Sequence, residues 1–145
     1  MFEGVFPALI TPFNADNRID VTSFRNIVEY VEKGGVAGMV ACGTTGESAT
    51  MSTQEHMDLI DLTVDCAKTT VIAGTGSNNT TEAVELTRHA YDAGANAVLV
   101  ISPYYNKPNN AGLIAHFSSI ARSADIPVIL YNVPSRTGQD MPLEV

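Results

Sequence analysis

Four short polar segments of this sequence each follow an apolar run and carry side chains that could perform chemistry. The segments are CGTTGE at 42–47, GTGSN at 74–78, SPYYNKP at 102–108 and YNVPSRTG at 131–138. The adjacent hydroxyls of Thr44 and Thr45, with free backbone amides, could hold a small carboxylate. Gly43 and Gly46 would let the backbone approach that ligand closely. An ordinary turn whose hydroxyls cap the following helix explains the first segment about as well.

The last segment contributes a phenol and a guanidinium. Tyr131 ends an apolar run, so its phenol is expected at a strand end, where it could shuttle protons if Thr44 linked it to a second phenol. Arg136 carries a planar cationic fork that suits a carboxylate. Each residue alone has a simpler interpretation, as a core tyrosine or a surface arginine. Because Thr44, Tyr131 and Arg136 all follow predicted strands, a shared functional site is the favoured interpretation.

The elements that must position these residues recur as a unit of apolar run, polar loop and helix. Apolar runs rich in β-branched residues cover 5–10, 36–42, 70–74, 95–101 and 126–132. Helical periodicity covers 21–33, 80–93 and 111–123, and a further helix follows Ser52, which forms a predicted capping box with Glu55. Either Asn109 or Asn110 is expected to cap the last helix.

Strands alternating with helices indicate an α/β fold. The spacing between runs averages about thirty residues, one eighth of the roughly 250 residues of a (β/α)8 TIM barrel. We therefore expect residues 1–145 to be the N-terminal part of a single barrel domain, with four βα units and a fifth strand. A doubly wound open sheet would alternate similarly, and periodicity does not exclude it.

Composition narrows the possible partners. Sixteen acidic against eight basic side chains give a net charge of −8, which argues against binding nucleic acid or an anionic membrane surface. The N-terminal sequence lacks a basic stretch followed by a long apolar run, so we expect a cytoplasmic protein. Cys42 and Cys66 show no metal-ligand spacing and are expected to be reduced thiols; for Cys42 a buried small side chain is favoured over a catalytic one.

The four polar segments, in this order and spacing, together with the opening FEGVFPALITPF, resemble the dihydrodipicolinate synthase family. This family belongs to the pyruvate-dependent aldolases, which include N-acetylneuraminate lyase, and the resemblance extends over essentially the whole chain. It implies a lyase of lysine (diaminopimelate) biosynthesis that condenses pyruvate with L-aspartate 4-semialdehyde through a lysine Schiff base. It also implies no metal or organic cofactor, and a homotetramer built from tight dimers.

The resemblance also assigns roles to individual residues. Thr44, Tyr131 and Tyr105 match the family's catalytic proton-relay triad, in which the second tyrosine comes from another subunit. Thr45 matches the residue that holds the carboxylate of pyruvate. Arg136 matches the arginine that receives the carboxylate of the aldehyde substrate, a feature that favours the synthase over a neuraminate or keto-deoxy-sugar lyase, the alternative enzymes.

A second set of positions matches the feedback site of members that lysine inhibits. These positions are Ser48, Ala49, His56, Asn78, Glu82 and Tyr104. Thr53 departs from the histidine that some of those members have, so the resemblance is incomplete there. For His56, an exposed helix residue is an interpretation at least as good as a ligand contact.

The resemblance further requires a nucleophilic lysine on a sixth strand, about thirty residues beyond Tyr131. The three lysines of this sequence, Lys33, Lys68 and Lys107, fall at helix ends or in a polar loop rather than on a strand. We therefore expect the 145 residues alone to be inactive. The alternative to a part of a synthase is a non-catalytic half-barrel that binds a small carboxylate or a partner chain.

Overall fold

In the computed structural model of the protein, which describes residues 2–145, four parallel strands form one sheet in the order β1-β2-β3-β4. The strands are β1 (Gly38–Ala41), β2 (Thr70–Gly74), β3 (Ala97–Ile101) and β4 (Val128–Tyr131). The helices are α1 (Val21–Lys33), α2 (Thr53–Cys66), α3 (Thr80–Ala93), α4 (Asn110–Ala121) and α5 (Pro134–Thr137), with 3-10 turns η1 (Thr44–Gly46) and η2 (Ser48–Thr50).

Local signals define the helices much as predicted. Helices α1 and α3 have the predicted bounds. The capping box before α2 is confirmed: the Ser52 hydroxyl accepts from the Glu55 amide at 3.2 Å, and the Glu55 carboxylate accepts from the Ser52 amide at 2.9 Å. Asn109 is the cap of α4. This helix stops at Ala121, two residues earlier than predicted.

The predicted first strand at 5–10 is not a regular strand. The segment runs parallel to β1 and bridges it at Ala8 and Val40. The Leu9 amide donates to the Val40 carbonyl, and the Val40 amide donates to the Pro7 carbonyl, both at 2.9 Å. Pro7 has no amide hydrogen to continue the ladder, which explains the interruption. The segment nevertheless borders the sheet where a strand was expected.

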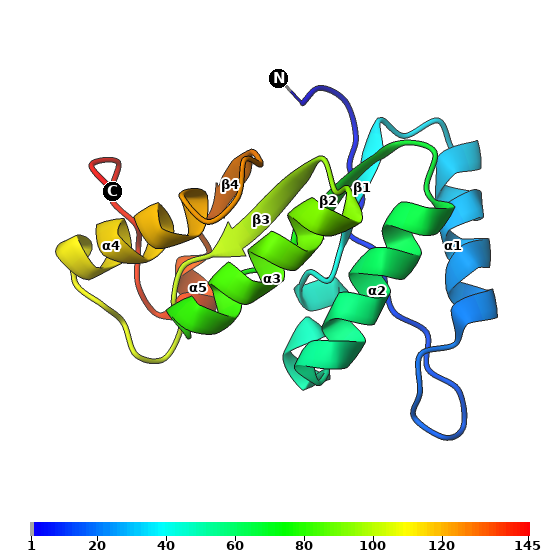
Figure 1. Ribbon diagram of the computed structural model, residues 1–145, viewed down its shortest axis with the longest axis horizontal. Helices are drawn as coiled ribbons and strands as arrows, with labels where there is room; N and C mark the ends of the chain where they lie inside the picture. The colour runs from blue at the N-terminus through cyan, green and yellow to red at the C-terminus, as the bar shows by residue number, and fades with distance from the viewer. Residues whose placement is uncertain (1) are drawn as a thin grey trace.

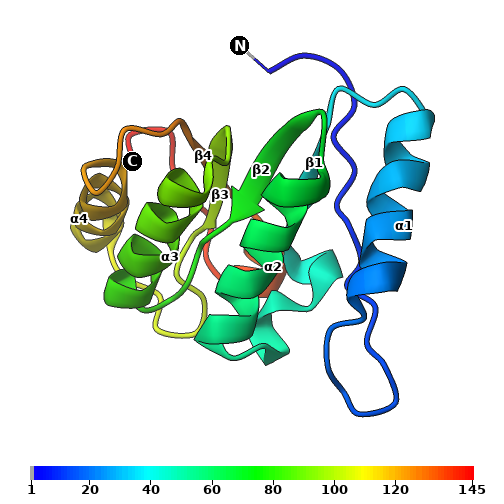
Figure 2. The same cartoon turned by 45° about the vertical axis from the view of Figure 1, so that its right-hand side comes forward.

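The two faces of the sheet have different environments. Helices α1 to α4 stand in a row over one face (Figures 1 and 2). Met39 and Val98 point into this layer and are fully buried with Phe24 and Leu59. Burying each such side chain stabilises the fold by about 1.5–3 kcal/mol. The register pairs Ile101 with Tyr131 and places Val40, Leu99, Ile101 and Tyr131 along the walls of a cavity on the other side.

This arrangement decides between the two predicted architectures. In a doubly wound sheet, helices cover both faces and the strand order reverses at a switch point. Here the four strands follow one another in chain order, and the four long helices share one face (Figure 2). The described residues therefore form consecutive units of a (β/α) barrel wall. No helix among residues 2–145 is both long enough and apolar enough to cross a membrane.

Candidate active site

All four polar segments lie at the same end of the sheet, because each follows the carboxyl end of a parallel strand. In Figure 1, the 3-10 turns η1 and η2, the loop before α4, and α5 lie at that end. This end is where (β/α) barrels hold their active sites. The four segments surround two adjoining cavities.

The smaller cavity has a volume of about 210 Å³ and lies on the face of the sheet opposite the long helices. Gly43, Thr44, Thr45 and Tyr131 line it, so the structure brings together four of the six residues predicted for catalysis and substrate binding. Its remaining walls are Ala8, Val40, Cys42, Ser48, Gly74, Gly76, Leu99 and Ile101. A mostly apolar wall with a few converging hydroxyls suits a small polar ligand.

The larger cavity has a volume of about 550 Å³ and shares Thr44, Ser48, Gly76 and Ile101 with the smaller one. Arg136 lies on its wall. The other lining residues are Ala49, Met51, Thr53, His56, Ser77, Glu82, Leu86 and Tyr104. Five of the six residues predicted for a feedback site therefore line this cavity.

Asn78, the sixth residue of that set, does not line the cavity. Its side-chain amide donates to the Tyr104 carbonyl at 3.3 Å, and its own carbonyl accepts from the Asn106 side chain at 3.1 Å. Asn78 therefore ties the loop after β2 to the loop after β3. The sequence could not distinguish this bracing role from a ligand contact.

His56 is buried, so its interpretation as an exposed helix residue is wrong. Its Nε2 lies 2.7 Å from the Gly74 carbonyl oxygen at the end of β2. Burial lowers the pKa of His56 below the ordinary value of 6.5, a shift opposed by the hydrogen bond to Gly74 and by the nearby Glu82 carboxylate. At neutral pH the imidazole is therefore uncharged. Glu82 accepts a hydrogen bond from the Ser77 hydroxyl on the same cavity wall.

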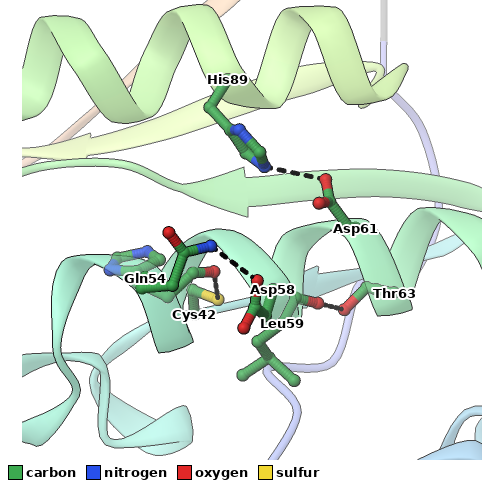
Figure 3. Close-up of polar contacts among 8 residues, drawn as sticks. Cys42, Gln54, Asp58, Leu59, Asp61, Thr63 and His89 are labelled. Carbon is green, nitrogen blue, oxygen red and sulfur yellow. Dashed lines mark hydrogen bonds and ion pairs between the residues drawn. The ribbon is translucent and has the colours of Figure 1, made fainter.

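Cys42 begins the turn that carries Thr44 and Thr45, and it is buried as the sequence favoured. Its thiol donates to the His56 carbonyl of α2 at 3.8 Å (Figure 3). Burial raises the pKa of Cys42 to about 12, so the sulfur remains a thiol at neutral pH. This state supports a packing role rather than nucleophilic catalysis.

Arg136 is held at the cavity mouth by the one-turn helix α5. Pro134 starts this helix, and Gly138 ends it with φ +71°, in the left-handed region that glycine adopts without strain. Thr137 is buried, and its hydroxyl donates to the Gln139 carbonyl at 2.8 Å. The Gln139 side chain in turn donates to the Pro108 carbonyl at 2.6 Å, which joins this loop to the one after β3.

Tyr105 is not brought together with Thr44 and Tyr131 within this chain. Its side chain is 91% exposed, and it lines neither cavity. Its backbone has φ +69°, a left-handed conformation that is uncommon outside glycine and asparagine. The tip of the loop therefore presents this phenol to solvent rather than to the cavities of its own chain.

No lysine among residues 2–145 lines either cavity. Lys33 pairs with Glu29 at 2.7 Å on the surface of α1, and Lys68 and Lys107 are exposed. In the same part of the chain, no group of three or more histidine, cysteine, aspartate or glutamate side chains is arranged to hold a metal ion.

Comparisons with known proteins identify similar sequences and structures. The profile of the dihydrodipicolinate synthetase family matches residues 1–145. A 4-hydroxy-tetrahydrodipicolinate synthase of Methanococcoides burtonii is 66% identical over 100% of this chain and 50% of its own length. The chloride-inhibited dihydrodipicolinate synthase of Acinetobacter baumannii, solved with pyruvate, superposes with a TM-score of 0.94 at 44% identity, over 97% of this chain and 49% of that one.

A third relative is the enzyme of Cyanidioschyzon merolae, solved with lysine bound. It superposes with a TM-score of 0.94 at 39% identity, over 99% of this chain and 50% of that one. The chain thus spans about half the length of the curated relatives and solved structures that it matches.

Proposed function

Since the chain belongs to the dihydrodipicolinate synthetase family, we propose that the protein containing it is a 4-hydroxy-tetrahydrodipicolinate synthase. The proposed reaction condenses pyruvate with L-aspartate 4-semialdehyde in lysine biosynthesis. One observation carries the proposal: Thr44, Thr45 and Tyr131 line one small cavity, and Arg136 lies on the wall of the cavity that adjoins it.

Pyruvate occupies the smaller cavity. The η1 turn supplies two adjacent hydroxyls, of which Thr45 binds the carboxylate of pyruvate, and Gly43 leaves space for close backbone approach. The apolar side chains of Val40 and Leu99 face the same space and suit the methyl end of the substrate. Neutral hydroxyls that donate hydrogen bonds to a carboxylate fix its orientation.

Tyr131 transfers protons during formation and breakdown of the covalent intermediate. A phenol can serve as a general acid or base, and Thr44 shares the cavity as the linking hydroxyl. We assign the second phenol of the relay to Tyr105 from another subunit, because Tyr105 is exposed and lines neither cavity of its own chain. A second subunit therefore completes the active site. The proposed assembly is a homo-oligomer, a tetramer of tight dimers.

Arg136 receives the carboxylate of L-aspartate 4-semialdehyde. It reaches the larger cavity from α5, and a guanidinium can bind a carboxylate through two parallel hydrogen bonds. Thr44 and Ser48 line both cavities, so the two spaces adjoin there. The aldehyde carbon can therefore approach pyruvate in the smaller cavity. This clamp favours a short carboxylated aldehyde over the polyol of a sugar acid.

The covalent nucleophile is a lysine outside residues 1–145. The chain's own lysines lie away from the two cavities, and the curated relatives are about twice as long as this chain. We place the reaction in the cytoplasm. The larger cavity is also the proposed lysine feedback site, through Ser48, Ala49, His56, Glu82 and Tyr104.

The test uses the product of the complete gene. The protein is mixed with pyruvate, treated with borohydride and measured by intact mass spectrometry, and condensation is then assayed with L-aspartate 4-semialdehyde and, separately, with N-acetylmannosamine. We expect one reduced pyruvate adduct per chain and turnover with the semialdehyde. An adduct with turnover of the sugar instead would identify a neuraminate lyase, and absence of any adduct would contradict Schiff-base chemistry altogether.

A further inference from the structure

The hydroxyl of Thr11 contacts the turn that carries Thr44 and Thr45. It donates to the Gly46 carbonyl at 2.7 Å, and the side chain is 5% exposed. Thr11 belongs to the opening segment FEGVFPALITPF, whose role the proposed reaction does not explain. It lines neither cavity, so it would not touch a ligand bound there.

The turn needs external support because its backbone is unfavourable at both ends. Cys42 has φ +55° and Glu47 has φ +60°, both left-handed and neither glycine. Such conformations cost free energy and persist where surrounding contacts hold them. Within the turn, the Gly46 amide donates to Gly43 at 3.0 Å and the Glu47 amide to Thr44 at 3.1 Å. These local bonds shape the turn but do not fix its place on the sheet.

The segment around Thr11 is itself attached to the sheet and can hold the turn in position. Leu9, two residues before Thr11, is buried, and its amide donates to the Val40 carbonyl of β1 at 2.9 Å. Gly46 packs closely against this segment: a Cβ added there would lie 3.1 Å from the Leu9 carbonyl oxygen and 3.2 Å from the Thr11 hydroxyl. The turn is therefore held against the N-terminal segment by one hydrogen bond and by tight packing, and that segment is itself hydrogen-bonded to β1.

We propose that Thr11 is a positioning residue for the reaction, which holds the η1 turn so that Thr44 and Thr45 keep their places in the smaller cavity. This inference rests on the proposed function. Removing the hydroxyl leaves the Gly46 carbonyl without its buried donor and frees the turn to move. A small displacement of groups that orient a substrate is enough to slow a reaction about tenfold to a hundredfold.

The test compares Thr11→Val, which keeps the shape and loses the hydroxyl, with Thr11→Ser, which keeps the hydroxyl. Thr63→Val is the matched control, because the Thr63 hydroxyl is also buried and donates to a carbonyl, that of Leu59 at 2.6 Å, far along α2 (Figure 3). All variants are made in the complete gene product. Amide hydrogen exchange of residues 43–47 and steady-state kinetics with both substrates are measured.

We expect Thr11→Val to raise hydrogen exchange at 43–47 by about tenfold, to raise the KM for pyruvate and to lower kcat, as loss of one buried hydrogen bond allows. Thr11→Ser should restore both properties, and Thr63→Val should change neither. Unchanged exchange at 43–47 in Thr11→Val would overturn the inference, as would unchanged kinetics in an active enzyme. If the wild-type protein does not react with pyruvate, the proposed function fails, and the exchange measurement alone decides whether Thr11 anchors the turn.

Discussion

The Nε2 atom of His56 lies 2.7 Å from the carbonyl oxygen of Gly74, which fastens α2 to the end of β2. The carbonyl can only accept, so Nε2 carries the proton of this contact. Gly74 also lines the smaller of the two cavities. Helix α2 therefore contacts a residue of the cavity wall through His56, a histidine that burial keeps neutral.

The first prediction concerns stability against pH. Burial lowers the pKa of both His56 and His116 below 6.5, so the unfolded chain binds protons more readily than the folded one. The stability that the two neutral histidines contribute is fully present above about pH 6.5. The free energy of unfolding declines as the pH falls through the window between the unfolded and folded pKa values. We expect the denaturant concentration at the unfolding midpoint to decrease as the pH is lowered from about 7.5 to about 5.5.

His116→Phe isolates one part of this effect. The Nδ1 of His116 lies 2.8 Å from the Thr80 hydroxyl, and its buried Nε2 has no hydrogen-bond partner among the described residues. The variant should lose less stability than the wild type over the same pH range. The exposed pair of His89 and Asp61, 2.8 Å apart between α3 and α2 (Figure 3), remains in both proteins. Equal pH slopes in the two proteins would contradict the assignment.

Tyr131→Phe in the complete gene product should lower kcat by about a hundredfold to ten-thousandfold, because the variant loses the phenolic proton donor and keeps the ring. The effect is measured by steady-state kinetics at saturating pyruvate and semialdehyde. Tyr91→Phe is the control, since Tyr91 is partly exposed on α3 and lines neither cavity. A Tyr131→Phe enzyme within a factor of about two of the wild type would remove this residue from the relay.

Arg136→Lys should weaken binding of the semialdehyde while leaving pyruvate trapping intact. Lysine keeps the charge but loses the planar pair of donors, so we expect the KM for the semialdehyde to rise about tenfold or more. Borohydride trapping of the pyruvate adduct provides the internal control, and Arg122→Lys, at the exposed C-cap residue that follows α4, provides the matched substitution. Loss of the pyruvate adduct in Arg136→Lys would place the arginine at the wrong substrate.

The two cysteines should differ in reactivity. Burial raises the pKa of Cys42 to about 12, and the pKa of Cys66 is also raised by burial, but Cys66 is only partly buried. The thiolate is the reactive form, so we expect iodoacetamide at pH about 8 to label Cys66 before Cys42. Peptide mass spectrometry after short exposure distinguishes the two sites. Faster labelling of Cys42 would mean that the turn opens to solvent on that timescale.

Much of the architecture was predictable because its signals are local. The capping box at Ser52 and the glycine that ends α3 at Gly94 fix helix ends within a few residues of sequence. The four polar segments are recognisable in the sequence because active-site residues of (β/α) barrels lie at the carboxyl ends of the parallel strands. That rule and the family resemblance were enough to predict that Tyr131 and Thr44 lie beside one cavity, whereas their roles in the reaction stay a proposal.

Contacts between distant segments were harder to predict. The Thr11 hydroxyl meets the Gly46 carbonyl across 35 residues, and nothing in the pattern of either segment identifies the partner. The burial of His56 is not predictable from its position on α2, because it depends on where that helix meets the carbonyl of Gly74. The irregular pairing of 5–10 is predictable from Pro7, because this residue has no amide hydrogen to donate to a neighbouring strand.

The strand order carries a consequence for how the chain folds. Val40 pairs with Ile72, Ile72 with Ala97, and Val98 with Val128, so each strand meets the next along the sequence. Each pairing closes a loop of only about thirty residues, and the entropic cost of closure grows slowly with loop length. A nascent chain can therefore add its βα units one by one as they leave the ribosome, each docking on an edge already formed.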